Sequence, residues 1–250
     1  MEVIKILALA VVSILMLYLL ILVISALLVP FSREYTKNSR FYRFLLYSFT
    51  AISLKVVRVR LHVTGIQKLP KDSRFLLVCN HRSKFDPIVT WQVFRKQDLA
   101  FISKPENFQI PVFGHLIHRC CFLPIDREQP KNAMKTILKA VKLIKDNQVS
   151  IAVYPEGTRS KDLTLLPFHN GVLKIAQKAD VPIVVLSIHG TETIHRNYPL
   201  HHSDVYIDVL DVLSTEYVHE HTTAELGDYI RSEMETALQD YTVHEGGLNS

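Results

Sequence analysis

The sequence predicts an α/β fold, with a largely parallel or mixed central sheet flanked by helices and preceded by an N-terminal two-helix membrane-anchoring motif. Three observations support this prediction. After residue 57, apolar segments of strand length alternate with segments of helical periodicity. Polar residues follow at once where two of the apolar segments end, near Asn80 and near Glu156. The stretch Ile6–Val29 contains no charged residue.

Two apolar stretches at the N-terminus suit a membrane. Ile6–Val29 is long enough to cross a bilayer, which takes about 20 apolar residues, and it lacks the small-residue cleavage site of a signal peptide. Phe41–Val57 carries Arg43 and Lys55 near its ends, as suits a helix in the headgroup layer. Residues 1–56 are therefore the predicted membrane-associated helices. Whether the first one spans, and whether the second belongs instead to the soluble core, stays open.

Charge indicates how the chain is oriented and what it can bind. Arg33, Lys37, Arg40 and Arg43 follow the first stretch, against Lys5 before it. By the positive-inside tendency, we expect a membrane protein whose remaining chain faces the cytoplasm. The formal net charge of +5 suits an anionic membrane surface or a phosphorylated ligand. The sequence has no zinc-finger, helix-turn-helix or RNA-binding signature, so we expect no nucleic-acid partner.

Residues 57–243 are expected to form one α/β domain, with residues 244–250 as a frayed tail. The segment 57–64 alternates apolar and polar residues, as in a half-exposed strand, whereas the segment 183–188 is apolar except for Ser187 and should be central. The expected strands are Val57–Thr64, Phe75–Cys79, Leu99–Ser103, Cys120–Ile125, Val149–Tyr154, Ile183–Ile188 and Val205–Leu210.

Helices are expected between these strands. They are Ile88–Phe94, a short turn or helix at Ile110–Ile117, Ala133–Asn147, Asn170–Ala179, and a last helix after a capping box formed by Thr222 and Glu225. On the helix 133–147, one apolar face is expected to contain Met134, Ile137, Leu138, Val141 and Ile144. Its lysines line another face, which we interpret as solvated rather than as a membrane contact.

The stretch FLLVCNHRSKFDP, residues 75–87, combines a buried strand with a polar break. Proline favours the first position of a helix, so we expect Asp86 to be the N-cap of the helix that follows. The intervening loop lets the imidazole of His81 fold back onto the Asp86 carboxylate. A histidine oriented by a carboxylate can act as a general base. The alternative is that Asp86 only caps its helix and that His81 is an incidental loop residue.

A second polar break, YPEGTRS at residues 154–160, repeats this pattern. Gly157 allows a tight turn or a close approach to a ligand, and the planar guanidinium of Arg159 suits a phosphate. Glu156 can hold a hydroxyl group or brace the arginine. Taken alone, the turn is also consistent with an ordinary surface turn in which Glu156 pairs with Arg159.

Taken together, these stretches resemble the membrane-bound glycerolipid acyltransferases, and within them the 1-acylglycerol-3-phosphate acyltransferases. The family's Asn-His-x4-Asp block is met by Asn80, His81 and Asp86, and its Phe-Pro-Glu-Gly-Thr-Arg-Ser block by residues 154–160, with Tyr154 in place of phenylalanine. An Ile-Asp-Arg block is met at residues 125–127, although Cys121 stands where a glycine is common, and a Val-Pro-Ile-Val block is met at residues 181–184.

The resemblance implies a function. His81 would remove the proton from the free sn-2 hydroxyl of lysophosphatidic acid, 1-acylglycerol 3-phosphate, while that oxygen attacks an acyl thioester. Asp86 would orient His81. Arg159 would bind the phosphate, helped by Lys104 and Arg127, and Glu156, Gly157 and Thr158 would form the rest of the substrate-binding turn. In the segment that contains Lys104, the residues Pro105 and Phe108 differ from those that are usual in the family.

The same resemblance implies the substrates. The product would be phosphatidic acid, made in phospholipid biosynthesis at the membrane, and no cofactor is expected beyond acyl-CoA or acyl carrier protein as co-substrate. The acceptor can instead be another lysophospholipid or glycerol 3-phosphate. A hydrolase of acyl esters or thioesters is less consistent, because there is no Gly-x-Ser-x-Gly motif. A non-catalytic membrane protein is a further alternative, disfavoured by the intact pair of His81 and Asp86.

The cysteines and remaining histidines are interpreted as structural. Cys120 and Cys121 are adjacent and cannot easily form a disulfide with each other, so we expect reduced thiols. Together with His115 and His118 they lack a recognised metal-ligand spacing, and we expect no metal. Strand alternation makes Cys79 a small buried residue rather than an acyl carrier.

Overall fold

A computed structural model describes residues 1–126, 129–160 and 162–246, and in this part of the chain seven strands form one sheet. The predicted α/β class is therefore confirmed. The strands are β1 (Val59–Thr64), β2 (Leu76–Cys79), β3 (Leu99–Ser103), β4 (Leu123–Pro124), β5 (Ser150–Val153), β6 (Ile183–His189) and β7 (Ser203–Leu213).

The sheet is mixed, in the order β1-β7-β6-β2-β5-β3-β4. Only the β6–β7 pair is antiparallel; the other neighbours among these strands run parallel. Strands β2, β5 and β6 are buried along their whole length, as expected for the centre of a sheet that is covered on both faces. Because β2, β5, β3 and β6 are mutually parallel, their carboxyl ends lie along one edge of the sheet.

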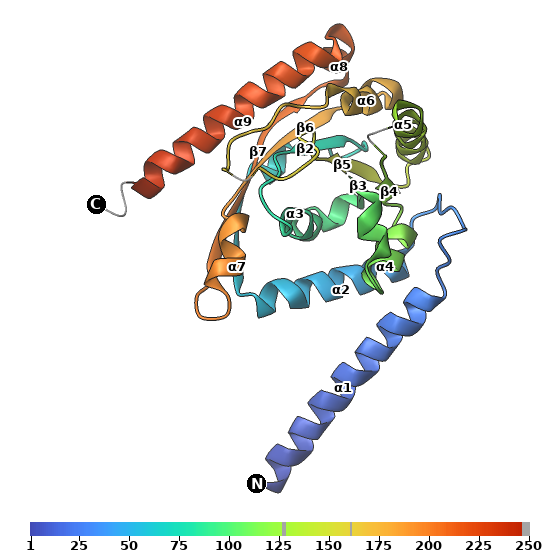
Figure 1. Ribbon diagram of the computed structural model, residues 1–250, viewed down its shortest axis with the longest axis vertical. Coiled ribbons are helices and arrows are strands. Elements are labelled where there is room, and N and C mark those ends of the chain that lie inside the picture. Colours follow the sequence, from blue (N-terminus) through green and yellow to red (C-terminus); the bar gives the residue numbers. More distant parts are fainter. Residues whose placement is uncertain (127–128, 161, 247–250) are drawn as a thin grey trace.

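Helices cover both faces of this sheet, which Figure 1 shows lying between α2, α3 and α4 on one side and α5, α6, α8 and α9 on the other. The α-helices in the described residues are α1 (Glu2–Leu27), α2 (Arg40–Val56), α3 (Asp86–Val93), α4 (Phe113–Arg119), α5 (Pro130–Lys145), α6 (Lys174–Ala179), α7 (Ile194–Asn197), α8 (Thr215–Glu220) and α9 (Thr223–Gly246). Short 3-10 turns are η1 (Ile66–Lys68), η2 (Arg95–Gln97), η3 (Pro105–Gln109), η4 (Asn170–Leu173) and η5 (Thr191–Thr193).

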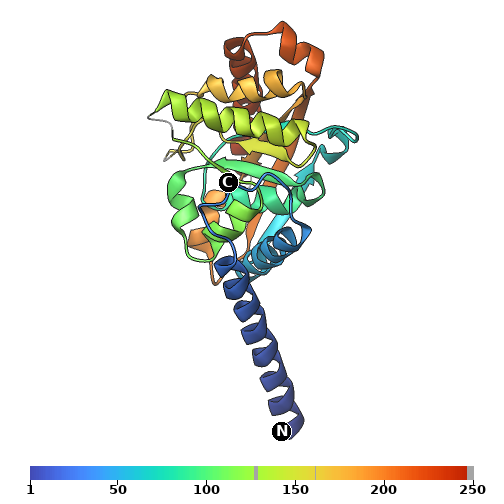
Figure 2. The same cartoon turned by 90° about the vertical axis from the view of Figure 1, so that its right-hand side faces the viewer.

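Helix α1 projects away from the α/β body, residues 57–246, and exposes most of its apolar side chains (Figures 1 and 2). It is long and apolar enough to cross a membrane, and this suggests membrane association. Its C-terminal part is packed, because Leu22, Ser25 and Ala26 are buried and the Tyr42 hydroxyl donates a hydrogen bond to the Ser25 carbonyl at 3.1 Å. One turn earlier, the Tyr18 hydroxyl lies 2.8 Å from Ser48 Oγ of α2.

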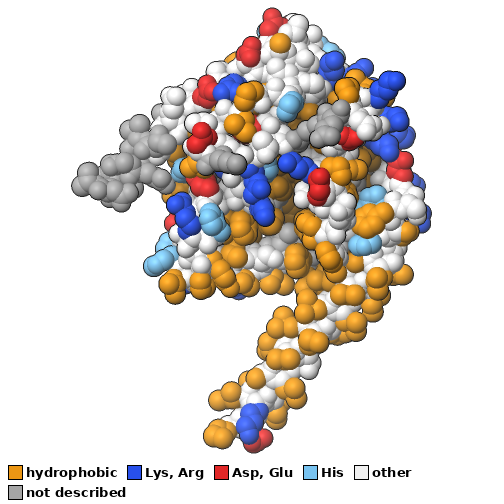
Figure 3. Space-filling model, in the orientation of Figure 1, with side chains coloured by type: hydrophobic (Ala, Val, Ile, Leu, Met, Phe, Trp, Pro, Cys, Tyr) orange, Lys and Arg blue, Asp and Glu red, His pale blue; other side chains and the backbone are white. Residues whose placement is uncertain are grey.

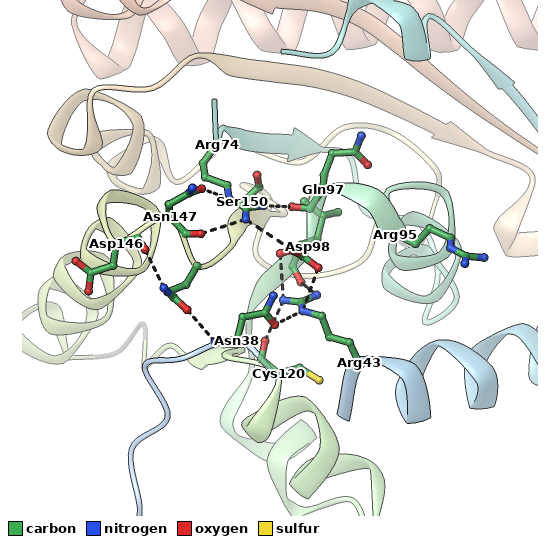
Figure 4. Close-up of polar contacts among 12 residues, drawn as sticks. Asn38, Arg43, Arg74, Arg95, Gln97, Asp98, Cys120, Asp146, Asn147 and Ser150 are labelled. Carbon is green, nitrogen blue, oxygen red and sulfur yellow. Dashed lines mark hydrogen bonds and ion pairs between the residues drawn. The ribbon is translucent and has the colours of Figure 1, made fainter. Parts of the chain in front are cut away.

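Helix α2 lies along the body, and the surroundings of its Arg43 differ from the prediction. Arg43 was expected near the headgroup layer, but its side chain is only 3% exposed. It donates hydrogen bonds to the carbonyls of Leu99 at 2.8 Å and Asp98 at 3.1 Å, and it lies 3.5 Å from the Asp98 carboxylate. Figure 4 shows the guanidinium pointing toward Asp98 and Cys120, with Arg95 pointing away. Arg43 therefore attaches α2 to the body.

The structure also corrects the prediction of a strand at Cys120–Ile125. Only Leu123 and Pro124 pair with β3, because Cys120 ends α4 and Cys121 has a left-handed backbone with φ of 65°. A left-handed residue favours glycine, which explains why glycine suits this position.

Smaller differences concern the helices. The predicted helix Asn170–Ala179 is a 3-10 turn followed by α6. On α5, Met134 and Leu138 are exposed, contrary to the prediction, and the buried face is completed instead by Thr136, Ala140 and Leu143. The capping box before α9 is confirmed, because Thr222 N donates to a Glu225 oxygen at 2.7 Å and Glu225 N to Thr222 Oγ1 at 3.3 Å. Helix α9 continues through Gly246, and the rest of the expected tail lies outside the described residues.

Candidate active site

The site begins where β2 ends. Cys79 is the last strand residue, and Asn80 closes the strand: its side chain donates to the Ile188 carbonyl at 2.9 Å and accepts from the Ile188 N–H at 2.7 Å. These two hydrogen bonds continue the pairing of β2 with β6 after the backbone of β2 turns away. Consequently His81 leaves the sheet at a fixed point on the edge formed by the strand carboxyl ends.

The expected contact between His81 and Asp86 is present. His81 Nδ1 lies 2.8 Å from Asp86 Oδ2. Because a carboxylate only accepts, Nδ1 carries the proton, and the lone pair of a neutral ring is on Nε2. The Asp86 side chain is fully buried, whereas the His81 side chain is 18% exposed. The imidazole thus has one anchored nitrogen while part of the ring reaches the surface.

The predicted N-cap role of Asp86 is wrong. Phe85 occupies the N-cap of α3, and Asp86 is the first helical residue. Its carboxylate turns back over the preceding loop, where Oδ2 accepts from the N–H groups of Arg82 at 2.6 Å and Ser83 at 2.7 Å. The N–H groups of Ile88 and Val89, which a cap at Asp86 would bind, donate instead to the Phe85 carbonyl at 3.0 and 2.9 Å. Asp86 therefore orders the loop that carries His81 rather than the start of the helix.

Glu156 holds the same loop from the neighbouring strand β5. Oε1 accepts from the His81 N–H at 2.6 Å, and Oε2 accepts from the Leu166 N–H at 2.9 Å. Both oxygens are thus bound to backbone, and Glu156 makes no ion pair with Arg159, contrary to the surface-turn alternative. Burial raises the pKa of Glu156, although these two N–H groups favour the carboxylate.

Tyr154, which replaces the family's phenylalanine, packs on the imidazole. Its ring stacks on His81 with the centroids 4.4 Å apart and the planes 24° apart. The hydroxyl lies 3.5 Å from Thr90 Oγ1, and burial raises the pKa of the phenol well above its usual value. The phenol is therefore un-ionised at neutral pH, and the ring restricts His81 to one plane.

The turn after Glu156 brings a basic side chain to the same edge. Ser160 N donates to the His81 carbonyl at 3.2 Å, so the backbone of Arg159 lies within one residue of that contact. Gly157 has φ of 73°, as expected for a tight turn that favours glycine. Thr158 and Arg159 are exposed, and Arg159 makes no hydrogen bond or ion pair with another described residue. Its charge is available to an anionic ligand.

Comparison with known proteins agrees with this geometry. A family model described as Acyltransferase matches residues 60–189, more than half of the chain. The chain belongs to the acyltransferase family. The resemblance inferred from the sequence motifs is thereby confirmed.

Individual relatives carry more specific names. The 1-acyl-sn-glycerol-3-phosphate acyltransferase of Borreliella burgdorferi is 27% identical over 191 residues, covering 74% of this chain and 76% of that protein. The protein of the same name from Escherichia coli is 28% identical over 165 residues, covering 66% and 67%. The chloroplastic 1-acyl-sn-glycerol-3-phosphate acyltransferase BAT2 of Brassica napus is 35% identical over 133 residues, covering 53% of this chain but only 38% of its own length. The chain thus spans less than half of some of the relatives that it matches.

A solved structure shares the fold. The crystal structure of the 1-acyl-sn-glycerophosphate acyltransferase PlsC from Thermotoga maritima superposes with a TM-score of 0.67 at 24% identity. The match covers 80% of this chain and 81% of that chain. The mixed sheet and its flanking helices are therefore an arrangement that the family uses.

The remaining predicted site residues fall in different places. Lys104 directly follows β3, so it lies at the same sheet edge as His81; it is exposed and makes no ion pair with another described residue. Arg127 lies outside the described residues. Among the residues described, no group of three or more histidine, cysteine or acidic side chains could hold a metal. Cys79 is fully buried, and burial raises its thiol pKa well above the usual value, which disfavours a reactive thiolate.

Sequence reasoning missed a third polar break at this edge, after β6. Thr191, fully buried, donates its hydroxyl proton to Asp86 Oδ1. The neighbouring Glu192 lies 3.2 Å from Arg82 Nη1, which also lies 3.1 Å from His189 Nδ1. The signal was present in the sequence, because the apolar strand 183–188 runs into His-Gly-Thr-Glu in the way that β5 runs into Pro-Glu-Gly-Thr.

Proposed function

We propose that the chain is a 1-acylglycerol-3-phosphate O-acyltransferase, which transfers an acyl group from a thioester to the sn-2 hydroxyl of 1-acylglycerol 3-phosphate. The observation that carries the proposal is the bond between His81 Nδ1 and the buried Asp86 carboxylate, at a sheet edge where Arg159 and Lys104 are exposed and unpaired by described residues. The names of the relatives favour this acceptor.

His81 is proposed as the general base. Its Nε2 accepts the hydroxyl proton while the oxygen forms a bond to the thioester carbonyl carbon. The carbon–sulfur bond then breaks, and the imidazolium returns the proton to the departing thiolate. Asp86 keeps Nδ1 protonated and stabilises the imidazolium, as a carboxylate does beside a catalytic histidine. No metal or other cofactor is needed for these steps.

Arg159 and Lys104 are proposed to bind the acceptor phosphate, with Arg127 as a further candidate. A phosphate dianion that leaves water requires several donors, and an arginine can bind two of its oxygens at once. Gly157 and Thr158 would place their backbone near it. Glu156 would act by ordering the loops, since both of its oxygens already accept backbone N–H groups.

The apolar helices fit a substrate that resides in the bilayer. Figure 3 shows hydrophobic side chains around the base of the body and along α1, below a face where basic side chains gather. On α2, Phe41, Phe44, Ile52 and Val56 are exposed. An interfacial position with the body on the cytoplasmic side would let the acceptor remain in the lipid while the donor, acyl-CoA or acyl carrier protein, arrives from water.

An assay of the purified chain in detergent tests the proposal. The donors would be acyl-CoA and acyl carrier protein thioesters; the acceptors would be 1-acylglycerol 3-phosphate, glycerol 3-phosphate and lysophosphatidylcholine. We expect transfer to the first acceptor, a loss in kcat of about 10²- to 10⁴-fold for His81→Ala, and a raised KM for that acceptor in Arg159→Ala. His195→Ala and Arg196→Ala, exposed residues on α7, are the controls.

Two outcomes would contradict the proposal. A folded His81→Ala protein with the original rate would remove the base. Release of free fatty acid in place of an acylated acceptor would indicate a hydrolase. Preferred transfer to glycerol 3-phosphate or lysophosphatidylcholine would keep acyl transfer but replace the acceptor.

A further inference from the structure

A hollow lies where the apolar helix α1 ends. It has a volume of about 440 Å³ and shares no residue with the candidate active site. Leu28 and Val29 form its wall at the end of α1, the segment joining α1 to α2 contributes Arg33 and Lys37, and Arg119 enters from the end of α4.

The lining of this hollow carries more positive than negative charge. Arg33, Lys37 and Arg119 make no ion pair with another described residue. The carboxylate in the lining belongs to Glu34, which pairs with Lys139 of α5 at 3.1 Å. Three cations therefore surround a concave site in which the acidic side chain is already paired.

Aromatic rings hold the central cation in place. The Arg119 guanidinium lies over the rings of Tyr35 and Tyr42, 4.9 and 5.3 Å from their centroids, and donates a hydrogen bond to the Lys37 carbonyl at 2.9 Å. These contacts orient the planar group but leave its charge uncompensated, so several of its N–H groups can still bind an oxyanion.

The joining segment is itself fixed by two histidines of α4. His115 Nδ1 lies 2.7 Å from the Val29 carbonyl, and His118 Nε2 lies 2.9 Å from the Arg33 carbonyl. Phe31 packs on His115 with the ring centroids 4.2 Å apart and the planes tilted by 35°. Because a carbonyl accepts, both ring nitrogens donate. The backbone that lines the hollow is therefore held in place by the fold. His115 and His118, which lack a metal-ligand spacing, serve to fix this segment.

We propose that this hollow binds the phosphate of an anionic membrane phospholipid, as a site separate from the acyl-acceptor site. Leu28 and Phe31 remain exposed beside the cations, 70% and 47% respectively, so an apolar surface continues from the hollow onto α1. A phospholipid would lay its chains along that surface and its phosphate among the cations; a soluble phosphate would use only the cations. The inference rests on the proposed membrane position of α1 and does not depend on acyl transfer.

Native mass spectrometry of the full chain in detergent, titrated with phosphatidylglycerol or phosphatidylcholine, tests this site. We expect one tightly retained phosphatidylglycerol and weaker retention of phosphatidylcholine. Lys37→Gln should weaken phosphatidylglycerol binding about fivefold, the value of one cation at a membrane surface. Arg119→Lys should weaken it at least as much, because a lysine keeps the charge but loses the planar fork.

Controls separate this site from other effects. Lys178→Gln, an exposed residue on α6 that does not line the hollow, should bind phosphatidylglycerol as the wild type does. Arg159→Ala should also leave phosphatidylglycerol binding unchanged. A defect in the proposed catalytic site would therefore not be mistaken for a defect in this hollow. Thermal unfolding of each variant checks that Arg119→Lys is folded. If it is not, Lys37→Gln still tests the site, because the exposed Lys37 side chain makes no hydrogen bond or ion pair with another described residue.

Three results would overturn the inference. Equal retention of phosphatidylglycerol and phosphatidylcholine would remove the preference for an anion. Full binding by both Lys37→Gln and Arg119→Lys would attribute the preference to diffuse charge. Displacement of the lipid by millimolar inorganic phosphate or glycerol 3-phosphate would mean that the hollow recognises free phosphate rather than a lipid headgroup.

Discussion

Four donors converge on the Asp86 carboxylate: the His81 ring, the N–H groups of Arg82 and Ser83, and the Thr191 hydroxyl. A fully buried carboxylate remains ionised only when such donors replace water. The donors come from the loop after β2 and from η5 after β6, so the hydrogen bonding of this one carboxylate depends on two strand ends being correctly placed.

Thr191 is therefore expected to act as a positioning residue. In Thr191→Val the shape is kept but the donor to Asp86 Oδ1 is lost, and a hydrogen bond to a charged group is worth about 1.5–3 kcal/mol. We expect kcat to fall about tenfold or more with KM unchanged, and Thr191→Ser to restore it. Thr193→Val, which loses local bonds to the Gly190 carbonyl and the Asn197 side chain but none to Asp86, is the control. Equal losses in both valine variants would indicate a role in folding alone.

The raised pKa of Glu156 leads to a prediction about how the stability of the protein depends on pH. Burial raises its pKa, so the folded protein holds the carboxyl proton more tightly than the unfolded chain does. This group's contribution to stability is complete below its unfolded pKa of about 4.3 and is lost as the pH rises through the folded pKa. Relative to Glu156→Gln, the wild type should therefore become less stable between pH 4 and pH 8, measured by thermal unfolding.

Glu225 provides a control of opposite sign. The Thr222 backbone and hydroxyl in the capping box lower its pKa. Relative to Glu225→Gln, the wild type should lose stability as the pH falls through the folded pKa of Glu225, and regain it above the unfolded value. Parallel pH trends for the two variants would contradict the argument that burial dominates at Glu156.

At the scale of elements, the sequence was sufficient wherever apolar periodicity decided the structure. Strand β6 has seven buried residues in succession, and α9 has a capping box and a repeating apolar face, so both were predictable within about two residues. Pairing of His81 with Asp86 was also predictable, because the loop between them is short and begins at a strand end.

Elements fixed by tertiary contacts were not predictable. The apolar run at Cys120–Ile125 reads as a strand, but the left-handed residue Cys121 breaks it. Asp86 reads as an N-cap, but it binds loop N–H groups that only the folded chain brings near it. The role of Thr191 depends on β6 lying beside β2, although their strand segments are more than 100 residues apart in the sequence. Sequence periodicity contains no information about that adjacency.

The attachment of α2 gives a prediction at this scale. Arg43 Nη groups bind backbone carbonyls of Asp98 and Leu99, and its guanidinium lies over the Trp91 ring at 5.0 Å. Arg43→Lys keeps a charge but cannot serve these acceptors together. We expect a loss of about 3 kcal/mol in stability, and thus a fall of roughly 10 °C in Tm.

Arg95→Lys is the matched control, because the Arg95 side chain points away from this cluster in Figure 4. Its Tm should remain within about 2 °C of the wild type, as is usual for a surface substitution. A similar small change for Arg43→Lys would mean that α2 is held by its apolar contacts and that the buried arginine adds little.

At the scale of the whole molecule, α1 and α2 meet the body in different ways. Helix α2 runs along the body, with one face buried and the other exposing large apolar side chains. Helix α1 leaves the body, and its segment Glu2–Ile21, in which Tyr18 contacts Ser48 of α2, rises about 30 Å, which matches the hydrocarbon thickness of a bilayer. This combination favours α2 lying at the interface and α1 crossing the membrane.

Cysteine labelling tests this orientation, since Cys79, Cys120 and Cys121 are all buried and burial raises the pKa of Cys120 to about 12. With an impermeant maleimide, Glu2→Cys should react in intact cells, because a spanning α1 puts its N-terminus outside. Lys178→Cys on the body should react only after the membrane is permeabilised. If neither site reacts before permeabilisation, α1 lies within the cytoplasmic leaflet; if Lys178→Cys reacts first, the body faces outward and the positive-inside argument fails.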